Sequence, residues 1–513
     1  MTTSNTADSQ MQEKVFAFLA DRAPHRTGRR IDTHAASVFL EGERALKIKR
    51  AIHFPYLDYS TLAKRKAACE EELKVNRPFA PQIYRRVVPI TQSRDGSLNI
   101  DGDGTPVEFA VEMVRFDEHQ TMDQLAEAGS PDPELVGAIA DAIAASHAVA
   151  SPAPAGPWIE SILPIIADNT KAFRATACFP TGDIDRLDQA SRSAFSGVRD
   201  LLERRGRGGF VRRCHGDLHL ANIVLIEGKP VLFDAIEFDP LIASVDVLYD
   251  LAFPIMDFIH YGRRAAANIL LNRYLSTSSG ENIDALAAIP LFMSLRAAIR
   301  AKVFLARLDR LSEDKATAMQ QQALRYFELA HRLIQPCAPS LVAIGGLSGT
   351  GKSVLARALA PDVMPNPGAV VLRTDVLRKE LFNVREGDRL PERAYQPEIT
   401  GQVYETIAKR AERILSQGHS VIIDAVFARE AERANINDIA KRLNIRSVRL
   451  FLVADLATRW SRIGRRTNDA SDATPDIARL QDEYDLGTID WAVVDASGTP
   501  EQTLERCRTL AAI

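Results

Sequence analysis

The sequence lacks the patterns that mark several classes of protein. Its five cysteines lie far apart and form no C-x-x-C pair, which argues against a zinc site or a disulfide framework. No run approaches 18 apolar residues, and the polar start MTTSNTADSQMQEK has no apolar signal core. The formal net charge of −3 gives no overall attraction to nucleic acid or to a membrane. We therefore expect a cytoplasmic protein that has no membrane partner.

The length of the chain and a proline-rich segment indicate how it is divided into domains. A chain of 513 residues is long enough for two or three compact domains. The segment QPCAPS, with two prolines, marks a junction near residues 335–340. We predict a polar tail and helix over residues 1–24, a first domain over 25–335 and a second domain over 340–513.

The clearest motif is LVAIGGLSGTGKS, an apolar run that breaks into a glycine-rich turn ahead of a helix-forming stretch. It fits the phosphate-binding P-loop pattern G-x-x-x-x-G-K-[ST], in which backbone N–H groups and the positive end of the next helix attract phosphate oxygens. The Lys side chain reaches the β- and γ-phosphates, and the final Ser holds Mg²⁺. The residues predicted to bind ATP here are Gly346, Ser348, Gly349, Thr350, Gly351, Lys352 and Ser353, with Ser353 also a metal ligand.

A second informative stretch runs from residue 211 to residue 240. Its centre, NIVLI-EGK-PVLFD, predicts a β-hairpin, and pairing its two arms brings Asn222 and Asp234 to the same end. Asp217 lies five residues before Asn222, in the loop that feeds the hairpin. Three short polar side chains thus converge, which is the arrangement needed to hold Mg²⁺ and to orient a hydroxyl for phosphoryl transfer.

The segments HGDLHLAN and LFDAIEFDP resemble the aminoglycoside phosphotransferase family, whose fold is similar to that of eukaryotic protein kinases. His215, Asp217 and Asn222 match the family pattern H-x-D-x-x-x-x-N, and Asp234 matches its metal-binding Asp. The resemblance implies that Asp217 is the catalytic base for the acceptor hydroxyl and that Asn222 and Asp234 are Mg²⁺ ligands. It also implies an α+β kinase-like domain, with a small sheet lobe over about 25–116 and a helical lobe over about 117–335.

The same resemblance points to an ATP-binding pair in the sheet lobe. In the predicted strand ALKIK, alternate residues share a face, so Lys47 and Lys49 lie together opposite the core face. Lys47 fits the lysine that holds the α- and β-phosphates, with Lys49 as the competing choice. Glu72, in the following helix, fits its partner, and Glu70 is the alternative.

Two further features of the first ATP site follow from the resemblance. Residues 112–114 would form the hinge that hydrogen-bonds adenine. No G-x-G-x-x-G is present to cover the phosphates, so Thr33 to Ser37 must serve instead.

After the P-loop, apolar strands alternate with helices, which predicts an α/β P-loop NTPase domain with a parallel sheet. Ligands bind such sheets at the carboxyl ends of the strands, where Asp375 and Asp424 fall. Asp375 could accept the proton of an acceptor hydroxyl, and Arg378, three residues on, could steady the developing charge. Asp424 would assist Mg²⁺. Ala425 follows it in place of the Glu that motor ATPases use to activate water, which favours kinase chemistry.

Asp375 and Arg378 resemble the pair found in polynucleotide kinases and related small P-loop kinases, including gluconate kinases and zeta-toxin-like enzymes. The stretch RWSRIGRRTNDASDA resembles the arginine-bearing lid of this group. Arg459, Arg462 and Arg466 share a helical face and could clamp phosphates when the lid closes.

Together these features predict a bifunctional kinase that uses ATP and Mg²⁺ at two separate sites. The acceptors are expected to be small molecules, such as a sugar, a sugar acid or a nucleoside. One alternative is a nucleic-acid 5′-hydroxyl kinase, for the C-terminal domain only. The other is a regulatory nucleotide-sensing protein with one inactive kinase unit. The oligomeric state and any order of action between the sites stay open.

Overall fold

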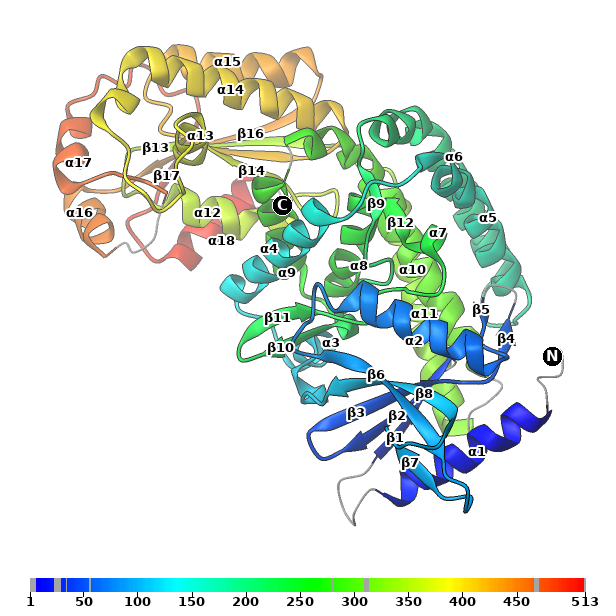
Figure 1. Ribbon diagram of the computed structural model, residues 1–513. Helices are drawn as coiled ribbons and strands as arrows, with labels where there is room; N and C mark the ends of the chain where they lie inside the picture. The colour runs from blue at the N-terminus through cyan, green and yellow to red at the C-terminus, as the bar shows by residue number, and fades with distance from the viewer. Residues whose placement is uncertain are drawn as a thin grey trace. The chain divides into compact units, whose positions relative to one another are not determined.

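The computed structural model describes residues 6–22, 29–33, 35–54, 57–278, 280–308, 313–465 and 470–511 (Figure 1). Contacts group the chain into two compact units, and each is described by itself. Unit 1 contains Met1–Asp168 and Arg199–Asp257, and unit 2 contains Asn169–Val198 and Phe258–Ile513. The contacts thus divide the chain at other places than the predicted junction at 335–340, and the predicted domain limits stay a prediction.

Unit 1 begins with a six-stranded antiparallel sheet that is covered on both faces. Leu46 and Ile48 pack under helix α1 (Thr6–Asp21), as alternation on the strand predicts. Ala45 faces the other way and packs with Cys69 of α2 (Leu62–Asn76). The strands, in order across the sheet, are β1 (Arg29–Asp32), β2 (Ala36–Glu41), β3 (Arg44–Lys49), β8 (Thr105–Val114), β6 (Tyr84–Gln92) and β7 (Leu98–Ile100).

The predicted hairpin is present as β10 (Ile223–Ile226) and β11 (Lys229–Leu232), with Ile223 opposite Leu232. The turn residues Glu227 and Gly228 both have positive φ, as a two-residue hairpin turn requires. The remaining elements up to residue 260 are β4 (His53–Phe54), β5 (Leu57–Asp58), α3 (Met122–Ala128), α4 (Pro133–Val149), α5 (Ala155–Arg174), α6 (Thr181–Arg207), β9 (Val211–Arg213), α7 (Pro240–Ala243), β12 (Ser244–Asp246) and α8 (Val247–His260).

Unit 2 contains a five-stranded sheet that is parallel throughout, with its central strands fully buried. Its order is β14 (Val370–Arg373), β15 (Val421–Asp424), β13 (Ser340–Gly346), β16 (Arg446–Val453) and β17 (Ala492–Asp495). Helices α12 (Lys352–Leu359) and α18 (Pro500–Ala511) cover one face, and α14 (Pro397–Ser416) and α15 (Glu430–Arg442) cover the other (Figure 1). The predicted fold class, kinase-like followed by a P-loop α/β domain, is confirmed.

The other helices of unit 2 are α9 (Arg264–Thr277), α10 (Ile289–Leu305), α11 (Glu313–Ile334), α13 (Thr374–Leu381), α16 (Leu456–Gly464) and α17 (Pro475–Asp482). Among the described residues, one helical stretch, Gly280–Leu305, is long and apolar enough to cross a membrane by length and composition. Because 78% of its most apolar window is buried inside the protein, it has the character of a core helix.

Helix α9 covers the exposed edge of the parallel sheet. The side-chain amide of Asn272 accepts a hydrogen bond from the N–H of Val371 at 2.7 Å and donates one to the carbonyl of Ala369 at 3.1 Å. Asn268 donates to the same carbonyl at 3.0 Å. An edge strand presents unpaired backbone groups, and here the amide side chains of α9 satisfy them. Strand β14 is thereby held from both sides just before the residues that enter the second site.

Candidate functional sites

The first site begins with a lysine that joins two elements. Lys47, on β3, donates to Glu72 Oε1 of α2 at 2.7 Å and also bonds Asp234, which follows β11. Burial would lower the pKa of Lys47, but attraction by Asp234 and Glu72 outweighs it and raises the pKa well above its usual value. Desolvation would raise the pKa of Asp234, yet Lys47 holds it below the ordinary value. Lys47 therefore contacts both of the other predicted residues.

Lys49 and Glu70 have other surroundings. Lys49 Nζ lies 2.5 Å from Glu72 Oε2 and also bonds Glu237, which accepts a 2.9 Å hydrogen bond from the Tyr59 hydroxyl. Glu70 is 57% exposed and lies 3.7 Å from Lys66. The geometry thus favours Glu72 over Glu70 as the lysine partner. Lys49 belongs to a buried network with Glu237, a residue that sequence reasoning missed.

The Asp250 carboxylate fixes the loop that carries Asp217. The backbone N–H groups of His215 and Gly216 donate to that carboxylate at 3.3 and 2.9 Å. Gly216 has φ +83°, and a Cβ there would lie 2.9 Å from Ala243 Cβ, so the turn requires glycine. The side-chain N–H₂ of Asn222 donates to the backbone carbonyl of Asp217 at 2.8 Å. The predicted base and metal ligand are thereby held at one end of the hairpin.

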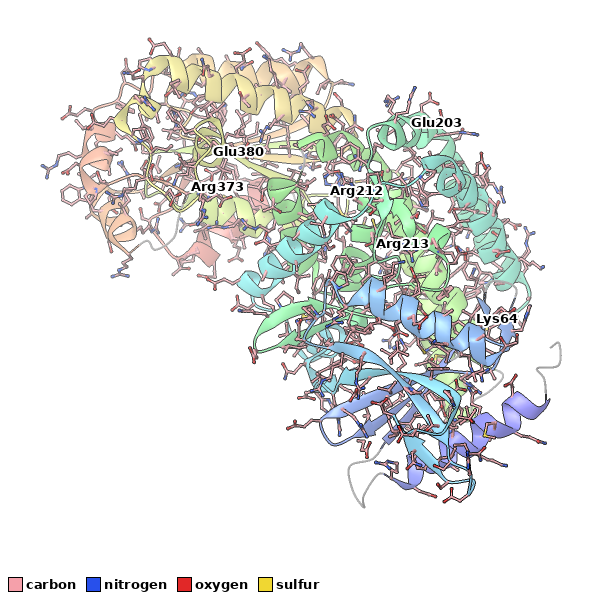
Figure 2. All side chains as sticks on the ribbon, viewed as in Figure 1. Lys64, Glu203, Arg212, Arg213, Arg373 and Glu380 are labelled. Carbon is pink, nitrogen blue, oxygen red and sulfur yellow. The ribbon has the colours of Figure 1, made fainter. Side chains whose placement is uncertain are left out.

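The environment of Asp217 includes a second histidine and an arginine clamp. His219 Nε2 lies 3.5 Å from the Asp217 carboxylate, which is 44% exposed. Arg213, labelled in Figure 2, donates to the carbonyls of Ile236 and Asp239 at 2.8 and 3.1 Å and so fixes the chain after Asp234. Asp217 is also close enough to exert an upward influence on the pKa of Asp234.

The hinge prediction needs adjustment. Residues 112–114 lie inside β8, paired with β3 and β6 on either side. The N–H groups of Val114 and Arg115 donate to the carbonyls of Ile83 and Glu43, both at 2.8 Å. The N–H groups of Val114 and Arg115 are therefore occupied by the protein and not open to an adenine ring. In the predicted covering segment, His34 lies outside the described residues, and Thr33 accepts from the N–H of Ala36 at 2.9 Å.

The P-loop joins β13 to α12 as predicted, with positive φ at Gly346, Gly349 and Gly351. A Cβ on Gly346 would lie 2.5 Å from the carbonyl oxygen of Leu452, so the close approach of β16 requires glycine there. Lys352 Nζ donates to the Leu347 carbonyl at 3.1 Å, across the mouth of the loop. Gly346, Ser348, Gly349, Thr350, Gly351, Lys352 and Ser353 are thus brought together in one turn.

The serine of the P-loop meets the acid of the neighbouring strand. Ser353 Oγ donates to Asp424 Oδ2 at 2.5 Å. Arg373, labelled in Figure 2, reaches the same pair, with Nε 3.3 Å from Asp424 and Nη2 3.1 Å from Ser353. The hydroxyl and carboxylate form an oxygen-only donor set that fits Mg²⁺. Arg373 was not predicted, and its place at the end of β14 is the signal that would have found it.

Asp375 and Arg378 enter the site from the first turns of α13. Burial, followed by repulsion from Asp424, raises the pKa of Asp375 above its usual value. Arg378 is buried and donates to the Ala394 carbonyl at 2.5 Å and to Thr400 Oγ1 at 3.2 Å. Its Nε has no hydrogen-bond partner among the described residues. An unpaired buried donor beside a candidate base is ready for an incoming oxygen.

The arginines of the predicted lid divide into different roles. Arg459 is 1% exposed and bonds the Ser348 and Ala478 carbonyls and Asp482, so it holds groups of the protein here and its role as a phosphate clamp stays a prediction. Arg462 reaches the P-loop at the Thr350 carbonyl, 3.4 Å away, and donates to the Gly498 carbonyl at 2.7 Å. Arg466 lies outside the described residues.

Two cavities flank the P-loop. One, of about 440 Å³, is lined by Thr350, Ser353, Arg462, Pro500 and Leu504 among others, and is mostly apolar. The other, of about 690 Å³, contains Asp375 and Arg378. Phosphoryl transfer between two substrates requires one compartment for the nucleotide and one for the acceptor, with the phosphate-binding loop between them. The two cavities have this arrangement.

These sites and folds define a phosphotransferase. Residues 58–288 match the family model described as phosphotransferase enzyme family, and residues 341–484 match the model described as AAA domain. The protein is therefore an enzyme that joins a phosphotransferase-family domain to a P-loop kinase domain, as the two resemblances predict.

Similar proteins include an uncharacterized protein of Mycobacterium tuberculosis, 29% identical in an alignment of 493 residues that covers 92% of this chain and 93% of the relative. Among solved structures, a choline/ethanolamine kinase family protein from Mesorhizobium loti covers 63% of this chain and 99% of its own, at 14% identity and a TM-score of 0.37. A gluconokinase from Sinorhizobium meliloti covers 34% and 92%, at 18% identity and a TM-score of 0.25.

Proposed function

We propose that the protein is a bifunctional cytoplasmic kinase. Each domain transfers the γ-phosphoryl group of ATP to a hydroxyl of a small-molecule acceptor. The observation that carries this proposal is that both domains hold a full set of candidate groups: Lys47, Asp217 and Asp234 in the first, and Lys352, Asp375 and Asp424 in the second. A sensor with one inactive unit would lack a base or a metal ligand in one of the two sets.

In the first site, Lys47 binds the α- and β-phosphates, and its pair with Glu72 fixes the direction of its ammonium. Asp217 accepts the proton of the acceptor hydroxyl. Asn222 and Asp234 are the oxygen donors for Mg²⁺, which neutralises phosphate charge when bound. The apolar residues Phe116 and Phe233, whose rings lie 4.9 Å apart, belong to the cluster that borders the space for adenine.

In the second site, the P-loop N–H groups and Lys352 bind the phosphates, and Ser353 with Asp424 supplies the metal donors. Asp375 takes the proton from the acceptor hydroxyl. Its raised pKa makes it a better proton acceptor than an ordinary aspartate. The free Nε–H of Arg378 stabilises charge on the transferring group.

Single isosteric substitutions in each domain test the proposal. Pools of metabolites and oligonucleotides are incubated with γ-labelled ATP and the wild-type, Asp217→Asn, Asp375→Asn or Asp200→Asn protein. Asp200 is an exposed residue of α6 and serves as the matched control. We expect Asp217→Asn and Asp375→Asn to remove different labelled products and Asp200→Asn to remove none. If neither site variant changes the labelling, both base assignments are wrong, and label on oligonucleotide ends would establish the nucleic-acid alternative.

A further inference from the structure

The acceptor cavity beside the P-loop has an unbalanced charge. The cavity has a volume of about 690 Å³. Its lining includes five carboxylate side chains but only two guanidinium groups. The carboxylates are Asp375, Glu432, Asp472, Glu483 and Asp485, and the guanidinium groups are Arg378 and Arg429. A site that recognises a sugar acid or a phosphate ester needs the opposite balance, because arginine forks are the usual partners of such anions.

Two of the basic residues near the cavity, Arg378 and Lys379, already bind groups of the protein. Arg378 donates to Ala394 and Thr400 and lies over the Tyr395 ring, with its guanidinium carbon 5.0 Å from the ring centre. Lys379 is buried, and its Nζ lies 3.3 Å from Oδ1 of Asp472, which lines the cavity. Arg429 directly precedes α15, as its N-cap residue, and is exposed. Apart from the Nε–H of Arg378 and the exposed Arg429, the described lining therefore offers no basic group to an anionic acceptor.

Some of the carboxylates remain open to the cavity. Glu432 is partly exposed and accepts a 3.2 Å hydrogen bond from the N–H of Arg429, while Tyr404 also bonds it. Glu483 is exposed at the rim. Neither of them has a salt bridge to a basic side chain among those found in the described structure. Each is thus available to a cation that enters the cavity.

The same cavity shows apolar surface to solvent. Tyr395 is 43% exposed, Leu480 60% and Tyr484 50%, and all three line it. Large apolar side chains that gather at the mouth of a polar cavity indicate a ligand with an apolar face. Aromatic rings beside carboxylates are also the surroundings that attract an organic cation.

We propose that the acceptor of the P-loop domain is a hydroxyl compound that carries a protonated amine and an apolar ring face, such as an amino sugar or aminocyclitol. The inference rests on the proposed function of this site. The acceptor oxygen forms a bond to the γ-phosphorus, the bond from that phosphorus to the β–γ bridging oxygen breaks, ADP leaves, and the hydroxyl proton goes to Asp375. Glu432 and Glu483 bind the ammonium group, and the tyrosines cover the ring.

Matched acceptors test the charge requirement. The full-length Asp217→Asn protein, in which the first site is silenced, is given γ-labelled ATP and glucosamine, glucose or gluconate, then the amine, neutral and acid members of a cyclitol series. We expect label in the amine members, and a rise of about fivefold in their KM for each of Glu432→Gln and Glu483→Gln, the loss expected of one partly exposed ion pair. Glu405→Gln, on the exposed side of α14, is the control and leaves the KM unchanged.

The outcomes separate this inference from the function beneath it. Preferential labelling of the acids, equal labelling of neutral and amine members, or no change in the two Gln variants overturns the amine assignment. Label in none of the six compounds also overturns it, provided that the wild-type protein binds ATP at two sites and the Lys352→Ala protein loses one of them. Failure of that ATP binding would instead overturn the proposed kinase function of the domain.

Discussion

Lys47 and Lys49, two residues apart on β3, share one buried carboxylate. Lys47 Nζ lies 2.7 Å from Glu72 Oε1, and Lys49 Nζ lies 2.5 Å from Glu72 Oε2. The two lysines then diverge, because Lys47 bonds Asp234, a proposed metal ligand, while Lys49 bonds Glu237. Glu72 thus contacts both the lysine that we propose binds phosphate and a lysine that is enclosed in the protein.

The divergence predicts that the two lysines affect different measurements. Lys47→Met should lower kcat/KM of the first site about a hundredfold, because a preorganised cation at the phosphates is lost. Its effect on stability should be small, since Lys49 still neutralises Glu72. Lys49→Met leaves Glu72 and Glu237 short of a cation in a buried position, so it should cost about 3–5 kcal/mol of unfolding free energy. For each variant, transfer of labelled phosphate measures kcat/KM, and urea unfolding measures the unfolding free energy.

Glu70→Gln is the control for this pair, because Glu70 is an exposed neighbour on the same helix. It should change neither quantity. Loss of activity without loss of stability in Lys49→Met would show that Lys49 is the phosphate-binding lysine instead.

The raised pKa of Asp375 predicts an acid limit on the second reaction. As a base, Asp375 must be ionised, so kcat/KM falls as the pH falls through its pKa, and burial with repulsion from Asp424 places that pKa above the usual aspartate range. Asp424→Asn removes the repulsion and should move the acid limb to lower pH, while also lowering the rate. The measurement is a pH–rate profile in the Asp217→Asn background. An unchanged limb in Asp424→Asn would mean that another group titrates.

Local patterns foretold much of both sites. Alternation on β3 placed Leu46 and Ile48 in the core and both lysines on the opposite face, because strand geometry fixes that choice. The hairpin brought Asn222 and Asp234 to one end, since two-residue turns fix register. The P-loop and the parallel strands followed from glycine spacing and apolar runs.

Contacts between distant segments could not be foretold in the same way. Glu237 and Arg373 belong to the sites through partners that the sequence does not pair with them. Arg459 looked like its neighbour Arg462, since both fit one helical face. Only packing of α16 against α17 and the P-loop reveals that Arg459 is enclosed. Helical periodicity shows which residues share a face, but it does not show what that face meets.

The enclosure of Arg459 predicts a structural effect for its removal. Arg459→Met leaves the carbonyls of Ser348 and Ala478 and the Asp482 carboxylate without their donor, so we expect a loss of about 3 kcal/mol or more in the stability of the P-loop domain. Arg462→Met should instead raise the KM for ATP with little change in stability, because Arg462 lines the cavity beside Ser353. Thermal unfolding and ATP titration distinguish them. A purely kinetic effect of Arg459→Met would support its role as a phosphate clamp.

A buried histidine makes the stability of unit 2 dependent on pH. His419 is 1% exposed, its Nε2 lies 2.9 Å from the Gly368 carbonyl, and burial lowers its pKa to about 4. The pKa of this histidine is about 6.5 in the unfolded chain and about 4 in the folded chain. Between these two pH values the unfolded chain binds a proton that the folded chain does not. The stability contribution is therefore complete above pH 6.5 and is lost as the pH falls, by about 1.4 kcal/mol per unit and roughly 3 kcal/mol in all.

His419→Gln isolates this effect, because a Gln amide can keep a donor near the Gly368 carbonyl but does not titrate. Urea unfolding at a series of pH values should show that the unfolding free energy of the variant falls less steeply between pH 6.5 and pH 4. The stabilities of the two proteins should be most alike at neutral pH. His53→Gln, at a half-exposed position in unit 1, is the control for the substitution itself. An identical slope in His419→Gln would place the acid sensitivity elsewhere. The position matters for function because Gly368 precedes β14, the strand that carries Arg373 and leads to Asp375, so acid loosening at His419 should reach the second site before the first.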